Sequence, residues 1–223
     1  QAASIISNGA DLWYWKVDSW LYSFAVDFFN TKNVPDVISM SWGWAERDQC
    51  SITTCNNITS SQYVNRVNVE YMKLALRGIT ITVASGDAGA PGRTNENCDS
   101  ENPINPVFPG SSPWVTSVGA TVIMKNKLLG LTQSKTLLCS IYTCAKGNEE
   151  HSIWYNLTGW TAGGGFGIYS TENVPEWQKN DVLNYLNNAK LPPSKNFNRN
   201  GRGYPDVAAI GHNCPVFTDN NLM

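Results

Sequence analysis

Short apolar runs that alternate with helix-like segments are the sequence feature that most limits the fold of this chain. Residues 37–41 and 79–84 are continuous apolar runs, which is typical of strands buried on both faces. Residues 60–77 carry apolar side chains at positions 64, 67, 71 and 74, the period of a helix, and Gly78 follows as a cap. A strand, a helix and a strand in this order form a βαβ unit. The sequence therefore predicts an α/β fold whose sheet is mostly parallel, with both runs as central strands and helices on both faces.

Other segments extend this pattern. We predict helices over residues 20–29 and 176–188, and strands over residues 12–17 and 114–123. Residues 1–7 are typical of the last turns of a helix, and residues 125–156 of an irregular insertion. In parallel sheets the functional groups lie on loops beyond the carboxyl ends of the strands. That rule points to two loops, residues 41–44 and 85–89.

Composition excludes several classes of protein. Of the 223 residues only 15% are charged, against roughly 25% in an average soluble domain, and 42% are hydrophobic, so the chain is not disordered. The formal net charge is −2 without basic runs, which argues against nucleic acid as a partner. No apolar run reaches the roughly 18 residues that cross a bilayer, so we expect no membrane span.

Six cysteines indicate an oxidising compartment. Two pairs, Cys50 with Cys55 and Cys139 with Cys144, each enclose four residues and are predicted disulfides. Zinc is the alternative, but zinc clusters favour C-x2-C spacings with histidine companions, which are missing here. Cys98 then pairs with Cys214 or with a cysteine beyond this chain.

Two sequons support the same compartment. Asn57 and Asn156 each begin an N-x-T sequence in a polar stretch, so both are predicted glycosylation sites. Glycosylation and disulfides together indicate the secretory pathway.

Common catalytic motifs do not fit the chain. His151 and His212 are the only histidines, and neither lies in a pattern that would serve a Ser-His-Asp protease. A G-x-S-x-G elbow, an HExxH helix and a P-loop are all missing from the sequence. The glycine run at residues 163–167 lacks the Lys-Ser/Thr of a phosphate loop, so we interpret it as a backbone-exposing loop.

Five segments resemble one family. Residues 83–90, VASGDAGA, resemble the S-G-D-x-G segment of the sedolisins, the serine-carboxyl peptidases. Four further segments agree with that family in order and spacing. They are SMSWG at residues 39–43, FPGSSPWVTSVG at 108–119, the glycine run at 163–166, and GRGYPDVA at 201–208.

The resemblance implies a subtilisin-like parallel fold and a Ser-Glu-Asp catalytic set. A glutamate replaces histidine as general base, so such an enzyme works in acid, where imidazole would be protonated. Asp87 corresponds to the aspartate whose protonated carboxyl group points into the oxyanion hole. The family's peptide substrate pairs in β fashion with the segment that matches Ser41, Trp42 and Gly43. Four further residues, Ser85, Gly86, Gly163 and Gly164, would border the specificity pocket.

One departure from the family matters most. Its E-x-x-x-D motif and its G-T-S-A nucleophile motif are both missing from these residues. We therefore expect residues 1–223 to be the central part of one catalytic domain, with the triad in flanking sequence on both sides. The fragment alone should then be inactive.

Partners and location follow from the same resemblance. We expect a peptide or protein substrate, a zymogen precursor whose remainder is continuous or present as a second chain, and a lysosomal, acidic-vacuolar or secreted location. No cofactor or metal is expected in this chain, although calcium is possible in the missing C-terminal part. The alternative function is a non-catalytic peptide-binding protein on the same fold.

Overall fold

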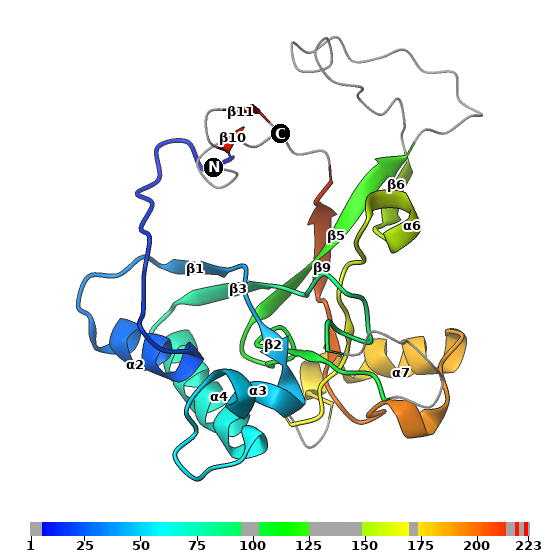
Figure 1. Cartoon of the computed structure of the whole chain (residues 1–223), viewed down its shortest axis with the longest axis horizontal. Helices are drawn as coiled ribbons and strands as arrows, with labels where there is room; N and C mark the ends of the chain where they lie inside the picture. The colour runs from blue at the N-terminus through cyan, green and yellow to red at the C-terminus, as the bar shows by residue number, and fades with distance from the viewer. Residues whose placement is uncertain are drawn as a thin grey trace.

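The computed structural model describes residues 6–94, 103–124, 149–169 and 174–212, and the backbone of residues 217–218 and 221–222. Its helices are α2 (Leu21–Asn30), α3 (Gln49–Ile52), α4 (Ser60–Leu76), α6 (Tyr155–Thr158) and α7 (Lys179–Asn188), with 3-10 turns η1 (Glu46–Asp48), η2 (Glu176–Gln178) and η3 (Ser194–Asn196) (Figure 1). Its strands are β1 (Val37–Met40), β2 (Trp44–Ala45), β3 (Thr80–Ala84), β4 (Val107–Phe108), β5 (Thr116–Met124), β6 (Glu149–Ser152), β7 (Gly165–Phe166), β8 (Gly203–Tyr204), β9 (Val207–Ile210), β10 (Phe217–Thr218) and β11 (Asn221–Leu222).

The main sheet is largely parallel. Strand β1 pairs in parallel with β3, β3 with β5, and β5 with β9, whereas β6 runs antiparallel to β5. Because β1 and β3 point the same way, the loops after Met40 and Ala84 emerge at the same end of the sheet. The predicted parallel α/β class is confirmed, and the predicted helices and strands at 20–29, 37–41, 60–77, 79–84, 114–123 and 176–188 are present with ends shifted by a few residues.

Strand β5 joins the two halves of the sheet. The carbonyl oxygens of Val118 and Ala120 accept from Ser85 and Ile153 at 2.9 and 3.3 Å, while that of Ser117 accepts from Asp206 at 2.9 Å. Successive carbonyls of a strand point to opposite edges. Strands β3 and β6 therefore follow one edge of β5, and β9 follows the other.

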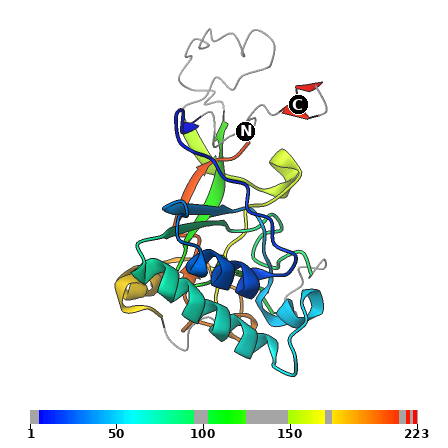
Figure 2. The ribbon, with the colours of Figure 1, turned by 90° about the vertical axis from the view of Figure 1, so that its left-hand side faces the viewer.

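Helices α2 and α4 lie side by side on one face of the sheet (Figure 2). Helix α4 begins with a capping box, in which Gln62 N–H donates to Thr59 Oγ1 and Thr59 N–H to Gln62 Oε1. It ends at Gly78, whose φ of +87° is left-handed. The side chains buried between these helices and the sheet form one core: Leu21, Ala25, Phe28, Ile38, Tyr63, Val64, Val67, Tyr71, Leu74, Ile79, Ile81, Val83, Phe108 and Val115.

The opposite face of the sheet is exposed in the described residues. Strand β1 buries Ile38 but exposes Val37 and Ser39, and all four residues of β9 are exposed. Continuous apolar character thus predicts strand β1 correctly, but β1 lies at the edge of the described sheet and is buried on one face only.

The predicted strand over residues 12–17 is wrong. This segment has no regular structure, because its aromatic side chains pack in place of a strand ladder. The rings of Trp13 and Trp15 stack at 6.4 Å, and Trp15 lies 5.1 Å from Phe28 of α2. Most of the helix end predicted at residues 1–7, and most of the insertion at 125–156, lie outside the described residues.

Candidate active site

The loops that follow β1 and β3 form the two walls of a pocket of about 100 Å³. That volume is well below the roughly 300–1,000 Å³ of a small-molecule site, so it suits a single side chain. The lining residues are Ser41, Trp42, Gly43, Trp44, Ala45, Ala84, Gly86, Asp87, Ala88, Gly92, Arg93 and Val107. Both loops in which the sequence predicts functional groups line this pocket.

Close backbone contact shapes the first wall. A Cβ atom on Gly43 would lie 2.8 Å from Val107 Cγ1 and 2.9 Å from the carbonyl oxygen of Phe108. Such distances exclude a side chain, so only glycine allows the chain to pass here. Trp44 and Ala45 continue as β2, which pairs with β4 and sets Val107 opposite the first loop.

The Asp87 loop is held by the segment before the glycine run. The Thr161 N–H donates to the carbonyl oxygen of Asp87 at 3.1 Å, and the Gly89 N–H donates to that of Thr161 at 3.1 Å. The Gly163 N–H donates to the carbonyl oxygen of Gly86 at 2.7 Å. A Cβ on Gly163 would lie 2.0 Å from the carbonyl oxygen of Ser85. Residues 161–163 therefore fix the backbone on both sides of Asp87.

The Asp87 side chain is free to reach a ligand. It is 66% exposed, and Oδ2 lies 3.9 Å from Nη2 of Arg93. The guanidinium of Arg93 also lies over the ring of Trp44, 5.8 Å from its centroid. Asp87 thus lies just beyond the carboxyl end of a parallel strand, with its carboxyl group in an open pocket.

A buried tyrosine and a buried glutamate support the pocket from behind. The Val107 N–H donates to the phenolic oxygen of Tyr204 at 2.8 Å. Burial raises the pKa of Tyr204, so its hydroxyl stays protonated through the ordinary pH range. Glu46 is fully buried, and its carboxylate accepts from Ser111 Oγ at 3.1 Å and from Ile168 N–H at 2.5 Å. Glu46 thereby ties two distant segments, at Ser111 and Ile168, to the turn after Trp44. Tyr204 holds Val107, which pairs with Ala45 of β2.

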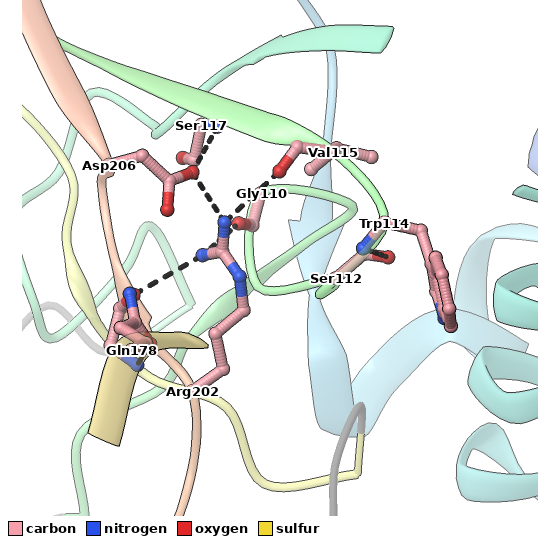
Figure 3. A network of polar contacts seen from close by, with 9 residues as sticks. Gly110, Ser112, Trp114, Val115, Ser117, Gln178, Arg202 and Asp206 are labelled. Carbon is pink, nitrogen blue, oxygen red and sulfur yellow. Dashed lines mark hydrogen bonds and ion pairs between the residues drawn. The ribbon is translucent and has the colours of Figure 1, made fainter. Parts of the chain in front are cut away.

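The guanidinium of Arg202 forms a second anchor (Figure 3). Its side chain is fully buried and donates to the carbonyl oxygens of Gly110 and Val115 at 3.2 and 3.1 Å, and to the carboxylate of Asp206. Asp206 also accepts from Ser117 N–H at 2.7 Å. Burial lowers the pKa of Arg202, although the charge of Asp206 opposes that shift. The network joins the loop after β4, the start of β5 and the turn before β9.

The structure separates the predicted site residues into two groups. Ser41, Trp42, Gly43, Gly86 and Asp87 line the pocket. Ser85 is buried behind it and bonded to Val118, Gly163 lies against Ser85 and Gly86, and a Cβ on Gly164 would lie 3.1 Å from the carbonyl oxygen of Tyr204.

Sequence reasoning missed Arg93 and Val107, which also line the pocket. Trp44 lies within the predicted loop of residues 41–44 but was given no role of its own. Arg93 and Val107 lie next to segments in which apolar residues recur with neither a helix nor a strand period, so no local sequence pattern identifies them.

Covalent features can be checked in part. Cys50 and Cys55 form a disulfide, as predicted. Cys98, Cys139, Cys144 and Cys214 lie outside the described residues. Asn57 and Asn156 are both exposed, which a glycosylation site requires.

The remaining tests concern metals and membranes. Within the part of the chain that the structure describes, no group of His, Cys, Asp or Glu side chains could hold a metal ion. No described helix has the length and apolar character needed to span a bilayer.

Comparison with known proteins adds independent information. Physarolisin of Physarum polycephalum is 42% identical over 217 residues, which are 96% of this chain and 37% of physarolisin. Human tripeptidyl-peptidase 1 is 35% identical over 188 residues, covering 81% of this chain and 25% of that protein. The solved structure of Pseudomonas sedolisin, a serine-carboxyl proteinase complexed with pseudo-iodotyrostatin, has a TM-score of 0.48 at 22% identity and covers 84% of this chain and 40% of sedolisin. No protein-family model matches the chain.

The largely parallel sheet and the pocket between the loops after β1 and β3 define an α/β protein whose candidate site lies beyond the carboxyl ends of its strands. Within that class, the similarity to physarolisin and tripeptidyl-peptidase 1 shows that the chain belongs to the sedolisin family. It spans between a quarter and two fifths of the length of these relatives.

Proposed function

We propose that this chain is the central part of the catalytic domain of an acid-acting serine-type peptidase. On this proposal the enzyme hydrolyses peptide bonds by a Ser-Glu-Asp mechanism, and the nucleophile and base come from flanking parts of the precursor. The observation that carries the proposal is the place of Asp87, which lies in an open pocket at the carboxyl end of β3, opposite the glycine-containing loop after β1. Similarity over 96% of the chain to physarolisin supports it.

The described residues would contribute two steps to catalysis. The backbone of residues 41–43 would pair in β fashion with an extended substrate. The Asp87 carboxyl group, when protonated, would donate a hydrogen bond to the oxyanion that forms as the scissile carbonyl becomes tetrahedral. An ionised carboxylate could not do this, because it only accepts hydrogen bonds and repels the developing charge.

The remaining assignments belong to the same proposal. A lysosomal, vacuolar or secreted location and glycans on Asn57 and Asn156 belong to it, as does a calcium site in the C-terminal part of the precursor, outside these residues. Cys139 would pair with Cys144, and Cys98 with Cys214 or with a cysteine elsewhere in the precursor. Removal of tripeptides, as opposed to internal cleavage, would require loops that close one end of the substrate groove.

Substitution of Asp87 in the full-length protein tests the mechanism. Asp87→Ala should lower kcat by about 10²- to 10³-fold, the usual effect of losing one oxyanion donor. Asp87→Asn should lose less, because an amide donates the same hydrogen bond without needing a proton. Pre-steady-state acylation rates from pH 3 to 7 would show both effects, with Asp181→Asn, an exposed change on α7, as the matched control.

Three results would contradict the proposal. Acylation by Asp87→Ala at the parent rate would make Asp87 an ordinary turn residue. A parent protein that binds peptides but cleaves none at any pH would favour the alternative function, a non-catalytic peptide-binding protein. Hydrolysis by residues 1–223 alone would show that the nucleophile has been misplaced.

A further inference from the structure

We propose that Arg93 makes the pocket selective for an acidic side chain of the substrate, glutamate or aspartate. This inference rests on the proposed function, since it names the class of substrate residue that the same pocket takes. Arg93 would be the residue that determines specificity, and the guanidinium would contact the substrate directly.

Local backbone geometry fixes the place of Arg93. The preceding Gly92 has a φ of +71°, and a Cβ there would lie 2.7 Å from the carbonyl oxygen of Asn105. The turn is tied by Gly92 N–H to the carbonyl of Gly89 at 3.2 Å and by Asn105 N–H to that of Ala90 at 3.2 Å. Arg93 therefore lines the pocket from a turn whose backbone these hydrogen bonds constrain.

The guanidinium lies between two features of the pocket wall. It is 3.9 Å from the carboxylate of Asp87 and 5.8 Å from the ring centroid of Trp44, and half of its side chain remains exposed. An arginine held over an aromatic ring keeps its planar fork ordered, while its outer N–H groups can still reach a ligand.

The charge balance of the pocket selects the ligand. Asp87 and Arg93 are the two charged side chains among its lining residues, and the other lining groups are backbone, aromatic or aliphatic apart from Ser41. The Asp87 carboxyl group lies 3.9 Å from Nη2 of Arg93, which is beyond hydrogen-bond distance, and half of the Arg93 side chain is exposed. A carboxylate of the substrate could therefore accept charge-assisted hydrogen bonds from the outer N–H groups of this guanidinium.

Other side chains fit this pocket less well. A lysine or arginine of the substrate would meet Arg93 as a like charge. An apolar side chain would cover the guanidinium and remove water from its donors without replacing those hydrogen bonds. The pocket volume of about 100 Å³ also favours a side chain that can contact Arg93 without needing a deep cavity.

Matched glutamate and glutamine peptides test the proposal in the full-length protein. Internally quenched peptides would carry Glu or Gln at each of the three positions before the scissile bond, one position at a time. At pH 5.5, where glutamate with a usual pKa of about 4.3 is ionised, we expect one position at which Glu raises kcat/KM about threefold to fivefold over Gln. That preference should vanish at pH 3, because the substrate carboxylate is then protonated.

Variants assign the preference to Arg93. Arg93→Gln should abolish the Glu preference, Arg93→Lys should keep part of it, and Arg93→Glu should replace it with a preference for Lys. Arg199→Gln is the matched control, because Arg199 also lies 5.8 Å from an aromatic centroid but does not line the pocket. A merely structural role for Arg93 would lower hydrolysis of Glu and Gln peptides equally.

Binding separates this proposal from the proposed function. Peptides N-methylated at the scissile amide would be titrated calorimetrically, again as Glu and Gln pairs. A Glu preference in binding that Arg93→Gln removes supports the proposal even for a protein without peptidase activity. Hydrolysis without any Glu preference, or a preference that Arg93→Gln leaves intact, overturns it and leaves the peptidase function standing.

Discussion

The backbone N–H of Gly163 donates a 2.7 Å hydrogen bond to the carbonyl oxygen of Gly86, the residue before Asp87. The contact leaves no room for a side chain, since a Cβ on Gly163 would lie 2.0 Å from Ser85 O. Gly163→Ala should therefore displace the Asp87 loop. A displacement of about 1 Å can lower turnover about 100-fold.

Activity assays of full-length Gly163→Ala, normalised to folded protein, would measure that loss. Gly159→Ala is the control in the same segment, because nothing lies within 4 Å of its Cβ position. It should keep most of its activity, although its φ of +82° strains any side chain. Equal activity in the two variants would show that the glycine contact does not position Asp87.

Local sequence patterns predicted which segments form helices and strands better than they predicted the segments and strands at the edge of the fold. Helix α4 follows from the spacing of Val64, Val67, Tyr71 and Leu74, all of which are buried. The strand predicted over residues 12–17 was wrong, because Trp13 and Trp15 give the same apolar pattern in a strand as in a segment that packs on a helix. For strand β1 the predicted burial on both faces was wrong. Apolar content alone does not indicate whether another layer of the protein covers the second face of a strand.

The rule for parallel sheets places residues that follow directly on a strand. It predicts that the loops with Gly43 and Asp87 lie together, and both loops line the pocket. Arg93 and Val107 could not be found in this way. Val107 is held by its hydrogen bond to Tyr204, and the turn before Arg93 is held by the hydrogen bond from Asn105 N–H to the carbonyl of Ala90. No local period encodes such contacts.

Thr59 has two separable roles. It is the third residue of the Asn57 sequon and the N-cap of α4. Thr59→Ala should remove the glycan and lower the free energy of unfolding by about 1 kcal/mol through loss of the cap. Thr59→Ser should keep both. Asn57→Asp should remove only the glycan, since aspartate also tolerates the left-handed φ of 67°.

Intact mass after secretion, together with denaturant midpoints of enzymatically deglycosylated samples, would separate these roles. If Thr59→Ala were as stable as Asn57→Asp, the capping box would contribute nothing measurable. An unchanged mass in Asn57→Asp would exclude this glycosylation site.

Alkaline pH should destabilise the fold through buried tyrosines. Burial raises the pKa of Tyr71 and of Tyr204 above the ordinary value of 10.0. The unfolded chain then releases these protons at lower pH than the folded chain does. The contribution of these protonated tyrosines to the free energy of unfolding is fully present below pH 10 and is lost as the pH rises above that value.

Denaturant midpoints between pH 8 and 12, with tyrosinate absorbance recorded in parallel, would show this decline. Tyr204→Phe should make the decline shallower, and should cost about 1–3 kcal/mol below pH 9 because the Val107 N–H loses its acceptor. Tyr14→Phe is the control, since Tyr14 is 93% exposed. A pH dependence identical in all three proteins would contradict the assignment.

Arg202 should be essential for stability. Arg202→Met removes the cation beside Asp206, which keeps its hydrogen bond from Ser117 N–H, and takes the Arg202 donor from the carbonyl oxygens of Gly110 and Val115. Loss of these buried hydrogen bonds should cost about 1–3 kcal/mol. Arg202→Lys keeps the charge but cannot span the same acceptors, so it should fall between Met and the parent. The exposed Arg199→Met should change the free energy of unfolding by less than about 0.5 kcal/mol. Equal denaturant midpoints for Arg202→Met and Arg199→Met would argue that the network is neutral.

The ties between distant segments also set the order in which this chain can fold. Helix α4 and strand β3 are adjacent in sequence, whereas Asp87 depends on residues 161–163 and Val107 on Tyr204. Closing long loops has an entropy cost that comes before the contacts that offset it, so local units form first. During synthesis the α4–β3 unit can assemble early, while the pocket waits until Tyr204 has left the ribosome. We therefore expect the nascent chain to pass through a stage with a folded helical layer and without the pocket between the loops after β1 and β3.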